Sequence, residues 1–217
     1  MLDWPCDIAE IADRLGIDKF SVMGVSAGGP YALACAFKIP ERLAGCGLVS
    51  TLSPGDMLMK AGPAFMRLTF WVGTYMPYVF KAYLRLTVTD KLRVKVADGK
   101  YLLRYASLLA EADKQLLSDP EVNKTLTLAM SESYKQGAQA GREAAITLGK
   151  PWGFRAEDIE FEHIFLWHGE KDGIMSIAPT RLFAQSLRNC EATYYLDESH
   201  FSTVVNHVDE IFTKLKG

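Results

Sequence analysis

The sequence predicts an α/β protein in which a mostly parallel sheet is flanked by helices and interrupted by an inserted helical cap. Short apolar runs typical of buried strands alternate with helical patterns in residues 1–52 and again in 154–217. Between them, in residues 53–153, this alternation stops and a helix-rich pattern takes over. Because strands that alternate with helices form parallel sheets, we expect residues 1–52 and 154–217 to build one core, and residues 53–153 to form the cap.

The first expected element is a helix with Asp3 at its N-cap and Gly16 at its end. Its apolar residues share one face: Ile8, Ile11, Ala12 and Leu15. A short buried strand follows at residues 20–23, and then a helix that stops near Pro40. The continuous apolar run L-A-G-C-G-L-V-S at residues 43–50 predicts a second strand, buried on both faces as in a parallel sheet.

The turn between the first strand and its helix has the sequence G-V-S-A-G, with Ser26 at its centre. A serine at a sharp strand-to-helix turn has a strained backbone that exposes its hydroxyl, as a nucleophile requires. We expect glycine at Gly24 and Gly28 because a Cβ at either position would clash where the strand and the helix approach closely. The backbone N–H of Ala27 lies at the helix N-terminus, where a developing oxyanion is stabilised.

The predicted cap begins after Pro54-Gly55 and is rich in aromatic residues between Phe65 and Tyr83. We expect these side chains to pack within the cap and on the sheet. A sharper interpretation is that some of them line an apolar substrate pocket, and a third is a peripheral contact with a membrane. Further along, S-D-P-E at residues 118–121 predicts a capping box that starts a helix toward Tyr134.

The alternation resumes with a strand, H-I-F-L-W-H, at residues 163–168. A helix at 179–187, a short strand at 193–196 and a terminal helix at 201–215 are expected to follow. The loop after each of these strands contains candidate catalytic residues: Asp172 in the first and His200 in the second.

Composition excludes several classes of function. The formal net charge of −2 gives no basic surface for a nucleic acid. The four cysteines have no metal-ligand spacing, so we expect free thiols in a reducing, cytoplasmic compartment and no metal site: Cys6, Cys35, Cys46 and Cys190. The start of the chain does not resemble a signal peptide. The most apolar window, residues 68–80, is too short for stable insertion into a membrane.

A serine hydroxyl needs a base to take its proton, and the base needs a third group to orient it. A serine at such a turn predicts that the acid and then the histidine follow it in the chain. His200 is the best candidate for the base, because it lies in the polar loop D-E-S-H-F. The other three histidines fit a strand or helix position better: His163, His168 and His207.

Asp172 is the preferred acid, because the turn after its strand places the carboxylate near the strand end that the histidine loop can reach. Asp56 is kept as an alternative, since the acid of a triad can also follow another strand. The other nearby carboxylates fit solvated turn positions better: Glu170, Asp197 and Glu198.

Five segments resemble the α/β-hydrolase fold superfamily: D-W-P-C-D-I, G-V-S-A-G-G-P-Y-A-L-A, P-W-G-F, L-W-H-G-E-K-D and S-H-F-S. More narrowly, they resemble lidded hydrolases grouped with the prolyl-iminopeptidase-like enzymes. The resemblance implies Ser26 as nucleophile, Asp172 as acid, His200 as base and the Ala27 N–H as one oxyanion donor. It also implies that residues 53–153 are the cap, and that the core is the C-terminal part of an α/β-hydrolase sheet.

The sequence departs from this superfamily at its start, where family members have several earlier strands and an oxyanion loop. The resemblance therefore implies that the strand at 20–23 is an exposed edge and that one oxyanion donor is missing. Two interpretations follow: a truncated hydrolase, or a sheet whose edge is covered by another chain, for example in a homodimer.

We therefore expect a serine hydrolase that cleaves an ester or related acyl bond of a small apolar substrate, without a cofactor. The alternative is a truncated, catalytically weak or inactive fragment that acts as a binding or oligomerisation module.

Overall fold

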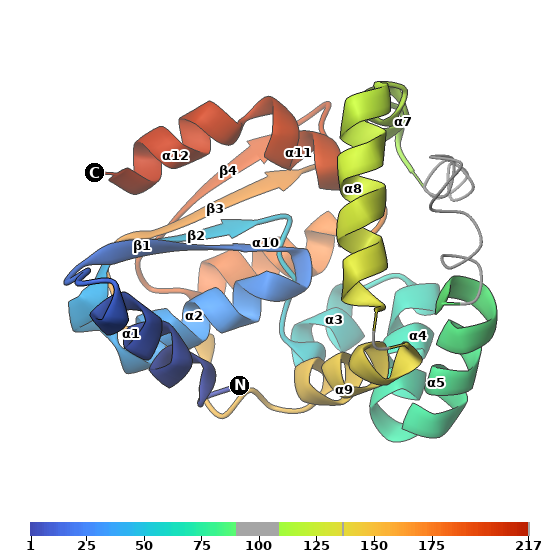
Figure 1. Ribbon diagram of the computed structural model, residues 1–217, viewed down its shortest axis with the longest axis horizontal. Helices are drawn as coiled ribbons and strands as arrows, with labels where there is room; N and C mark the ends of the chain where they lie inside the picture. Colours follow the sequence, from blue (N-terminus) through green and yellow to red (C-terminus); the bar gives the residue numbers. More distant parts are fainter. Residues whose placement is uncertain (90–108, 136, 217) are drawn as a thin grey trace. The chain divides into compact units, whose positions relative to one another are not determined.

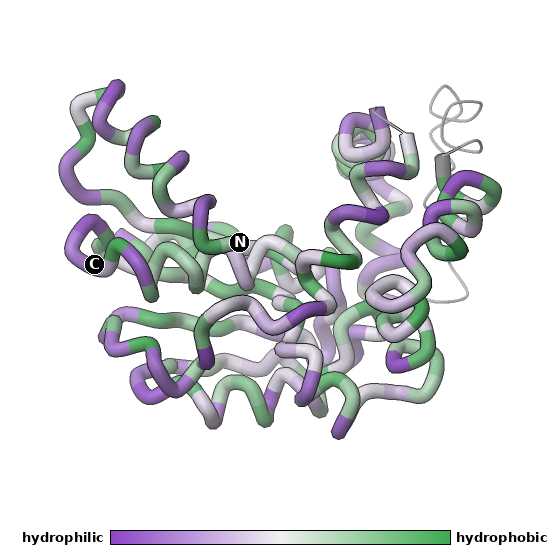
Figure 2. The backbone as a smooth tube through the Cα atoms, turned by 90° about the horizontal axis from the view of Figure 1, so that it is seen from below, coloured by the Kyte–Doolittle hydropathy of each residue, from purple (hydrophilic) through white to green (hydrophobic). Residues whose placement is uncertain are grey.

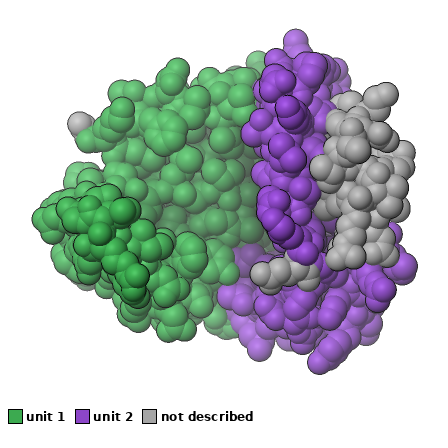
Figure 3. Space-filling view, in the orientation of Figure 1, with its two compact units in different colours: residues 1–62, 151–217 green, residues 63–150 purple. Residues whose placement is uncertain are grey.

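The computed structural model describes residues 1–89, 109–135 and 137–216. These residues form two compact units, residues 1–62 with 151–217 and residues 63–150, which are coloured separately in Figure 3. The part of the predicted cap between residues 90 and 108 lies outside the described residues.

The first unit contains a four-stranded parallel sheet with the strand order β1-β2-β3-β4 (Figure 1). Its strands follow one another in the chain: β1 (Phe20–Val25), β2 (Leu43–Val49), β3 (Ile164–Gly169) and β4 (Cys190–Tyr195). The pairing is parallel throughout, with Val25 opposite Val49 and Val49 opposite Trp167. Parallel pairing brings the carboxyl ends of all four strands to one end of the sheet, and the predicted site residues follow these ends.

Helices cover both faces of this sheet, as the parallel pairing requires. On one face lie α2 (Gly29–Lys38) and α10 (Ile177–Ser186); on the other lie α11 (His200–Asn206) and α12 (Val208–Lys216) (Figure 1). The remaining helices of this unit are α1 (Trp4–Arg14), which packs on α2, and α3 (Gly55–Ala61), which packs on α10. The prediction of an α/β fold with a parallel sheet flanked by helices is confirmed.

Each face of the sheet has its own apolar core. Leu48, Leu166 and Phe183 are fully buried on the face covered by α2 and α10. On the other face, Val49 and Trp167 pack against Ile211 of α12. Figure 2 shows hydrophobic and hydrophilic segments alternating along the chain, as expected for elements that each bury one side.

The second unit is helical in its described part. Its α-helices are α4 (Ala64–Tyr75), α5 (Pro77–Leu84), α7 (Glu111–Leu117), α8 (Pro120–Ser133) and α9 (Ala138–Gly149). Helices α4, α5 and α9 pack on one another, and α7 packs on α8. The boundaries differ from the predicted 53–153, since α3 groups with the first unit.

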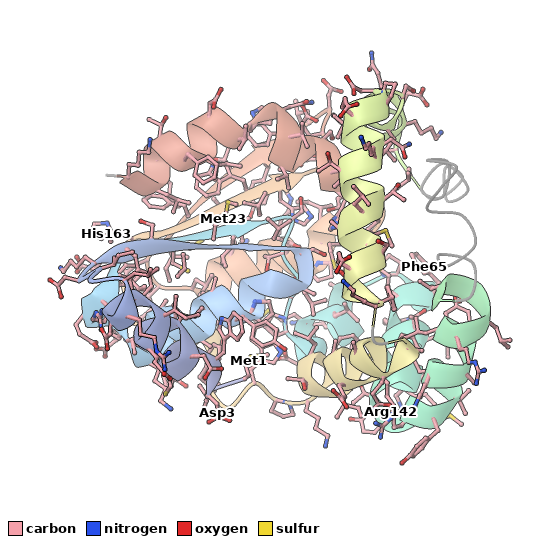
Figure 4. The ribbon with its side chains drawn as sticks, viewed as in Figure 1. Met1, Asp3, Met23, Phe65, Arg142 and His163 are labelled. Atoms are coloured by element: carbon pink, nitrogen blue, oxygen red, sulfur yellow. The ribbon has the colours of Figure 1, made fainter. Side chains whose placement is uncertain are left out.

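Several local predictions need correction. The predicted apolar face of α1 is only partly buried, because Ile11 and Leu15 remain exposed. The cap of α8 is Asp119 and not Ser118: the Asp119 carboxylate accepts the N–H groups of Glu121 and Val122. The aromatic side chains of α4 and α5 are largely exposed, among them Phe65, which Figure 4 labels.

Candidate active site

Ser26 directly follows β1 and opens a short 3₁₀ turn, Ser26–Gly28, that leads into α2. Its φ is +55°, in the left-handed region that non-glycine residues rarely adopt. The Ser26 carbonyl accepts a hydrogen bond from the N–H of Leu52 at 3.0 Å, which helps to hold the strained residue in place. Such strain is typical of functional sites, and here it fits the predicted turn.

The two glycines that flank Ser26 differ in what they contribute. A Cβ on Gly24 would lie 2.4 Å from the carbonyl oxygen of Gly28, so glycine is required there. A Cβ on Gly28 would meet nothing within 4 Å, and its φ of −78° suits any residue. The predicted clash at Gly28 is therefore wrong. The second close approach is at Gly29, whose Cβ would lie 1.8 Å from Thr51 Oγ1.

Ala27 lies in the 3₁₀ turn just before α2 and is exposed. Backbone N–H groups at the start of a helix have no carbonyl of a preceding turn to bind, and they carry partial positive charge. The position of Ala27 is thus suited to an oxyanion donor, a role that stays a prediction.

Asp172 and His200 form a buried pair at the carboxyl ends of β3 and β4. Asp172 Oδ2 lies 2.9 Å from His200 Nδ1, and both side chains are almost wholly shielded from solvent. A carboxylate can only accept, so Nδ1 carries a proton, and in the neutral form of the ring Nε2 keeps a lone pair. In this state His200 can act as a base through Nε2.

Backbone hydrogen bonds bring the two loops of this pair together. The N–H of Glu170 donates to the Tyr195 carbonyl at 2.9 Å, and the N–H of Lys171 donates to the Glu198 carbonyl at 3.0 Å. Gly169 allows this approach, because a Cβ there would lie 2.4 Å from the Glu198 carbonyl. The pairing of Asp172 with His200 therefore depends on the whole β3–β4 end.

The loop after β2 contacts both the serine turn and the histidine. Ser50 is buried, has a φ of +46°, and donates its hydroxyl to the His200 carbonyl at 3.2 Å. Two residues later, Leu52 holds the Ser26 carbonyl as described above. Among the described residues, however, no hydrogen bond joins the Ser26 hydroxyl to His200. Sequence reasoning missed Ser50, and a serine at a strand end gives no distinctive pattern.

The other candidate acids have different partners. Asp56 is exposed in the first turn of α3. Glu170 pairs with Arg181, and Asp197 pairs with Lys171 at 2.7 Å. Burial pushes the pKa of Glu198 upward, but hydrogen bonds from Ser202, Asn206 and His207 outweigh it and leave that pKa lowered. It is Asp172 that contacts His200.

Of the other three histidines, which all lie in the described part of the chain, His168 is the one that contacts Asp172. His163 precedes β3 at the amino end of the sheet, and Figure 4 labels it there. His207 lies between α11 and α12, stacked on Tyr195 and 3.3 Å from Glu198. His168 is fully buried near the end of β3, and its Nε2 lies 3.6 Å from Asp172 Oδ2. Burial lowers the pKa of His168, so it is neutral.

Three further observations concern the rest of the described residues. A shallow hollow lined by Lys19, Phe37 and Phe161 lies at the amino end of the sheet, away from Ser26 and His200. Within the described residues, no group of His, Cys, Asp or Glu side chains is arranged to hold a metal ion. No described helix combines the length and apolarity needed to cross a bilayer.

A strained serine after one parallel strand and a buried Asp–His pair after later strands define the class of folds built around a serine at a strand-to-helix turn. The chain belongs to the alpha/beta hydrolase fold family, whose sequence model matches residues 3–204. The narrower resemblance to prolyl-iminopeptidase-like enzymes stays a prediction.

Solved structures with the same fold include two esterases. The esterase of Thermogutta terrifontis matches with a TM-score of 0.62 and 16% identity, over 97% of this chain and 69% of that one. Esterase RhEst1 of Rhodococcus sp. ECU1013 matches with a TM-score of 0.62 and 16% identity, over 99% of this chain and 71% of that one.

Curated relatives match over a short segment only. Homoserine O-succinyltransferase of Bordetella avium is 44% identical over 50 residues, and that of Ralstonia pickettii is 46% identical over 50 residues. Each match covers 23% of this chain and 12% of the relative's length.

Proposed function

We propose that the protein is a serine hydrolase of the ester-cleaving type, with Ser26, His200 and Asp172 as its triad. The observation that carries this proposal is the buried 2.9 Å contact between Asp172 Oδ2 and His200 Nδ1. It leaves His200 Nε2 as the free basic atom. The loop after β2 contacts both His200 and Ser26. This supports a single site that contains Ser26, His200 and Asp172, the partner of His200.

In the first half of the reaction, His200 Nε2 takes the proton of the Ser26 hydroxyl as Ser26 Oγ attacks the substrate carbonyl. The carbonyl oxygen becomes an oxyanion, which the Ala27 N–H stabilises. Asp172 holds the imidazolium and its orientation. The tetrahedral intermediate then collapses, the ester C–O bond breaks, and His200 returns the proton to the leaving alcohol.

In the second half, His200 Nε2 takes a proton from water, which attacks the acyl-Ser26 carbonyl. Collapse of the second tetrahedral intermediate breaks the bond to Ser26 Oγ and returns the proton to Ser26. The products are one alcohol and one carboxylic acid. Hydrogen bonds between nucleophile and base are often long without substrate, so the missing Ser26–His200 bond is compatible with this sequence.

The substrate class proposed is a small, fairly apolar ester. Acyl transfer to an alcohol is a second candidate, favoured by the 44% and 46% identity over 50 residues to two homoserine O-succinyltransferases. The two reactions share the acyl-Ser26 intermediate and differ in whether water or an alcohol receives the acyl group. The inserted cap, here taken as the unit of residues 63–150, is part of this proposal as the segment that selects the substrate.

The test is hydrolysis of a p-nitrophenyl ester series, from acetate to octanoate, by the full chain and by Ser26→Ala. We expect p-nitrophenol release that Ser26→Ala abolishes. Homoserine is then added as an acceptor: a new O-acyl product in the mass spectrum favours acyl transfer. Equal release by the wild type and Ser26→Ala would contradict both reactions.

The competing proposal, a binding or oligomerisation module, concerns the edge strand β1. Met23 lies on this strand, is 36% exposed and is labelled in Figure 4. A lysine on an edge strand discourages pairing with another strand. A dimer mass in light scattering that Met23→Lys converts to a monomer would support pairing of two copies through β1. A monomer in both would contradict it.

A further inference from the structure

We propose that His168 is a positioning residue that holds Asp172 in the orientation His200 needs. This inference rests on the proposed function and extends it by one residue. His168 lies near the end of β3, four residues before Asp172, and its side chain is fully buried. The polar contacts of its Nε2 are with Met175 and Asp172, so its effect passes through Asp172.

The hydrogen bonds of Asp172 show how this works. Asp172 Oδ1 accepts two backbone N–H groups, from Ile174 at 2.8 Å and from Met175 at 2.7 Å. These bonds leave Oδ2 to face His200. The direction of Oδ2 therefore depends on where the turn at residues 172–175 places its N–H groups.

His168 also binds this turn, through the carbonyl oxygen of Met175. Its Nε2 lies 2.8 Å from the carbonyl oxygen of Met175, and 3.6 Å from Asp172 Oδ2. Met175 is thus bound twice: its N–H holds Asp172, and its carbonyl is held by His168. Loss of the second bond would let the turn shift and carry Asp172 with it.

The protonation of His168 suits this role. Burial lowers the pKa of His168, so the ring is neutral and carries one proton. Both oxygens near Nε2 are acceptors, which places the proton on Nε2 and leaves a lone pair on Nδ1. Within the described residues, His168 Nδ1 is buried and has no hydrogen-bond partner.

An unpaired buried nitrogen is costly and calls for an explanation. The neighbouring inward position on β3, Leu166, shows that an apolar side chain fits this core. The presence of an imidazole at 168 is explained if the bond made by Nε2 is worth more than the loss at Nδ1.

The test compares His168→Phe, which keeps a ring but removes the donor, with His168→Gln, which keeps an N–H donor at similar reach. Each is measured as the full chain for the rate of labelling by a fluorophosphonate, for kcat and KM on a p-nitrophenyl ester, and for thermal midpoint. We expect His168→Phe to lose 10- to 100-fold in labelling rate and kcat, on the order of other residues that orient a site, with KM unchanged. His168→Gln should recover most of this loss. His163→Gln, at the far end of the sheet, is the matched control and should behave as the wild type.

If His168→Phe does not fold, ¹⁵N-histidine NMR of the wild type provides a second test, with the His168 signals assigned by their loss in His168→Gln. A neutral ring protonated at Nε2 supports the inference, and a ring protonated at Nδ1 overturns it. Folded His168→Phe with the wild-type rate also overturns it, as does a loss that His168→Gln fails to recover. A wild-type chain that the probe does not label overturns the proposed function itself, and with it this role, so the two failures are distinguishable.

Discussion

His200 Nδ1 lies 2.9 Å from Asp172 Oδ2, although 28 residues separate the two in the chain. A helix, a strand and their connecting loops lie between the two residues in the chain. Their contact is direct and buried, and Ser50 also holds the His200 backbone. This relationship has consequences that can be measured.

Asp172→Asn should reduce kcat for ester hydrolysis by about 10⁴-fold, because an amide can favour the wrong histidine tautomer while leaving the geometry intact. The measurement is p-nitrophenyl ester turnover at saturating substrate. Asp197→Asn is the matched control: Asp197 is solvent-exposed, pairs with Lys171 and does not contact His200. Equal activity in the two variants would exclude Asp172 as the acid.

The two glycines beside Ser26 should respond oppositely to alanine. Gly24→Ala forces a Cβ into the Gly28 carbonyl and should lower the free energy of unfolding by about 1–3 kcal/mol. Gly28→Ala has room and a compatible φ, and should raise it by about 0.4–1 kcal/mol through the unfolded chain. Urea unfolding of both variants checks this pair; a similar loss in both would mean that the turn is built differently.

This contrast shows what the sequence could and could not reveal. The strained serine was predictable, because a strand, a turn and a helix are visible as local patterns around Ser26. Which glycine is needed was not predictable, since the restriction at Gly29 comes from Thr51, which follows a different strand, while Gly28 has open space. The same applies to Ser50, whose role depends on a contact with His200.

The boundaries of two elements also depend on contacts that the local sequence pattern does not show. The prediction of one terminal helix at 201–215 is wrong, because the helix is interrupted at His207. There the imidazole stacks on Tyr195 at 3.7 Å between ring centres and contacts Glu198. The strand predicted at 193–196 begins earlier, at Cys190, where pairing with Ile164 extends the ladder. In both cases, contacts between residues distant in the chain determine where the element begins or ends.

Stability should fall as the pH falls below the ordinary pKa of histidine, partly because of His168. Burial lowers the pKa of His168 below its usual value of 6.5, so the unfolded chain takes up this proton at a higher pH than the folded chain does. The contribution is therefore complete above pH 6.5 and is lost as the pH falls toward the folded pKa. Thermal midpoints between pH 8 and 5 should drop more in the wild type than in His168→Gln. Parallel curves would contradict a neutral, buried His168.

Thiol reactivity should distinguish one cysteine from the other three. Cys6 is exposed, whereas burial raises the pKa of Cys35 to about 11 and that of Cys190 to about 12. Burial also raises the pKa of Cys46. A thiol reagent at pH 8 should label one site rapidly in the native protein. The Cys6→Ser variant should lack this rapid labelling. Fast labelling of several thiols would contradict the buried positions.

The most direct test of the central claim is covalent labelling of Ser26 by a fluorophosphonate, followed by intact mass. The account predicts one adduct per chain in the wild type, no adduct in Ser26→Ala, and an unchanged adduct in Ser133→Ala, which removes an exposed serine on α8. It also predicts that Asp172→Asn slows labelling, because Asp172 orients the base. A folded wild-type chain that gains no adduct, or an adduct that persists in Ser26→Ala, would contradict the assignment of Ser26 as an activated nucleophile.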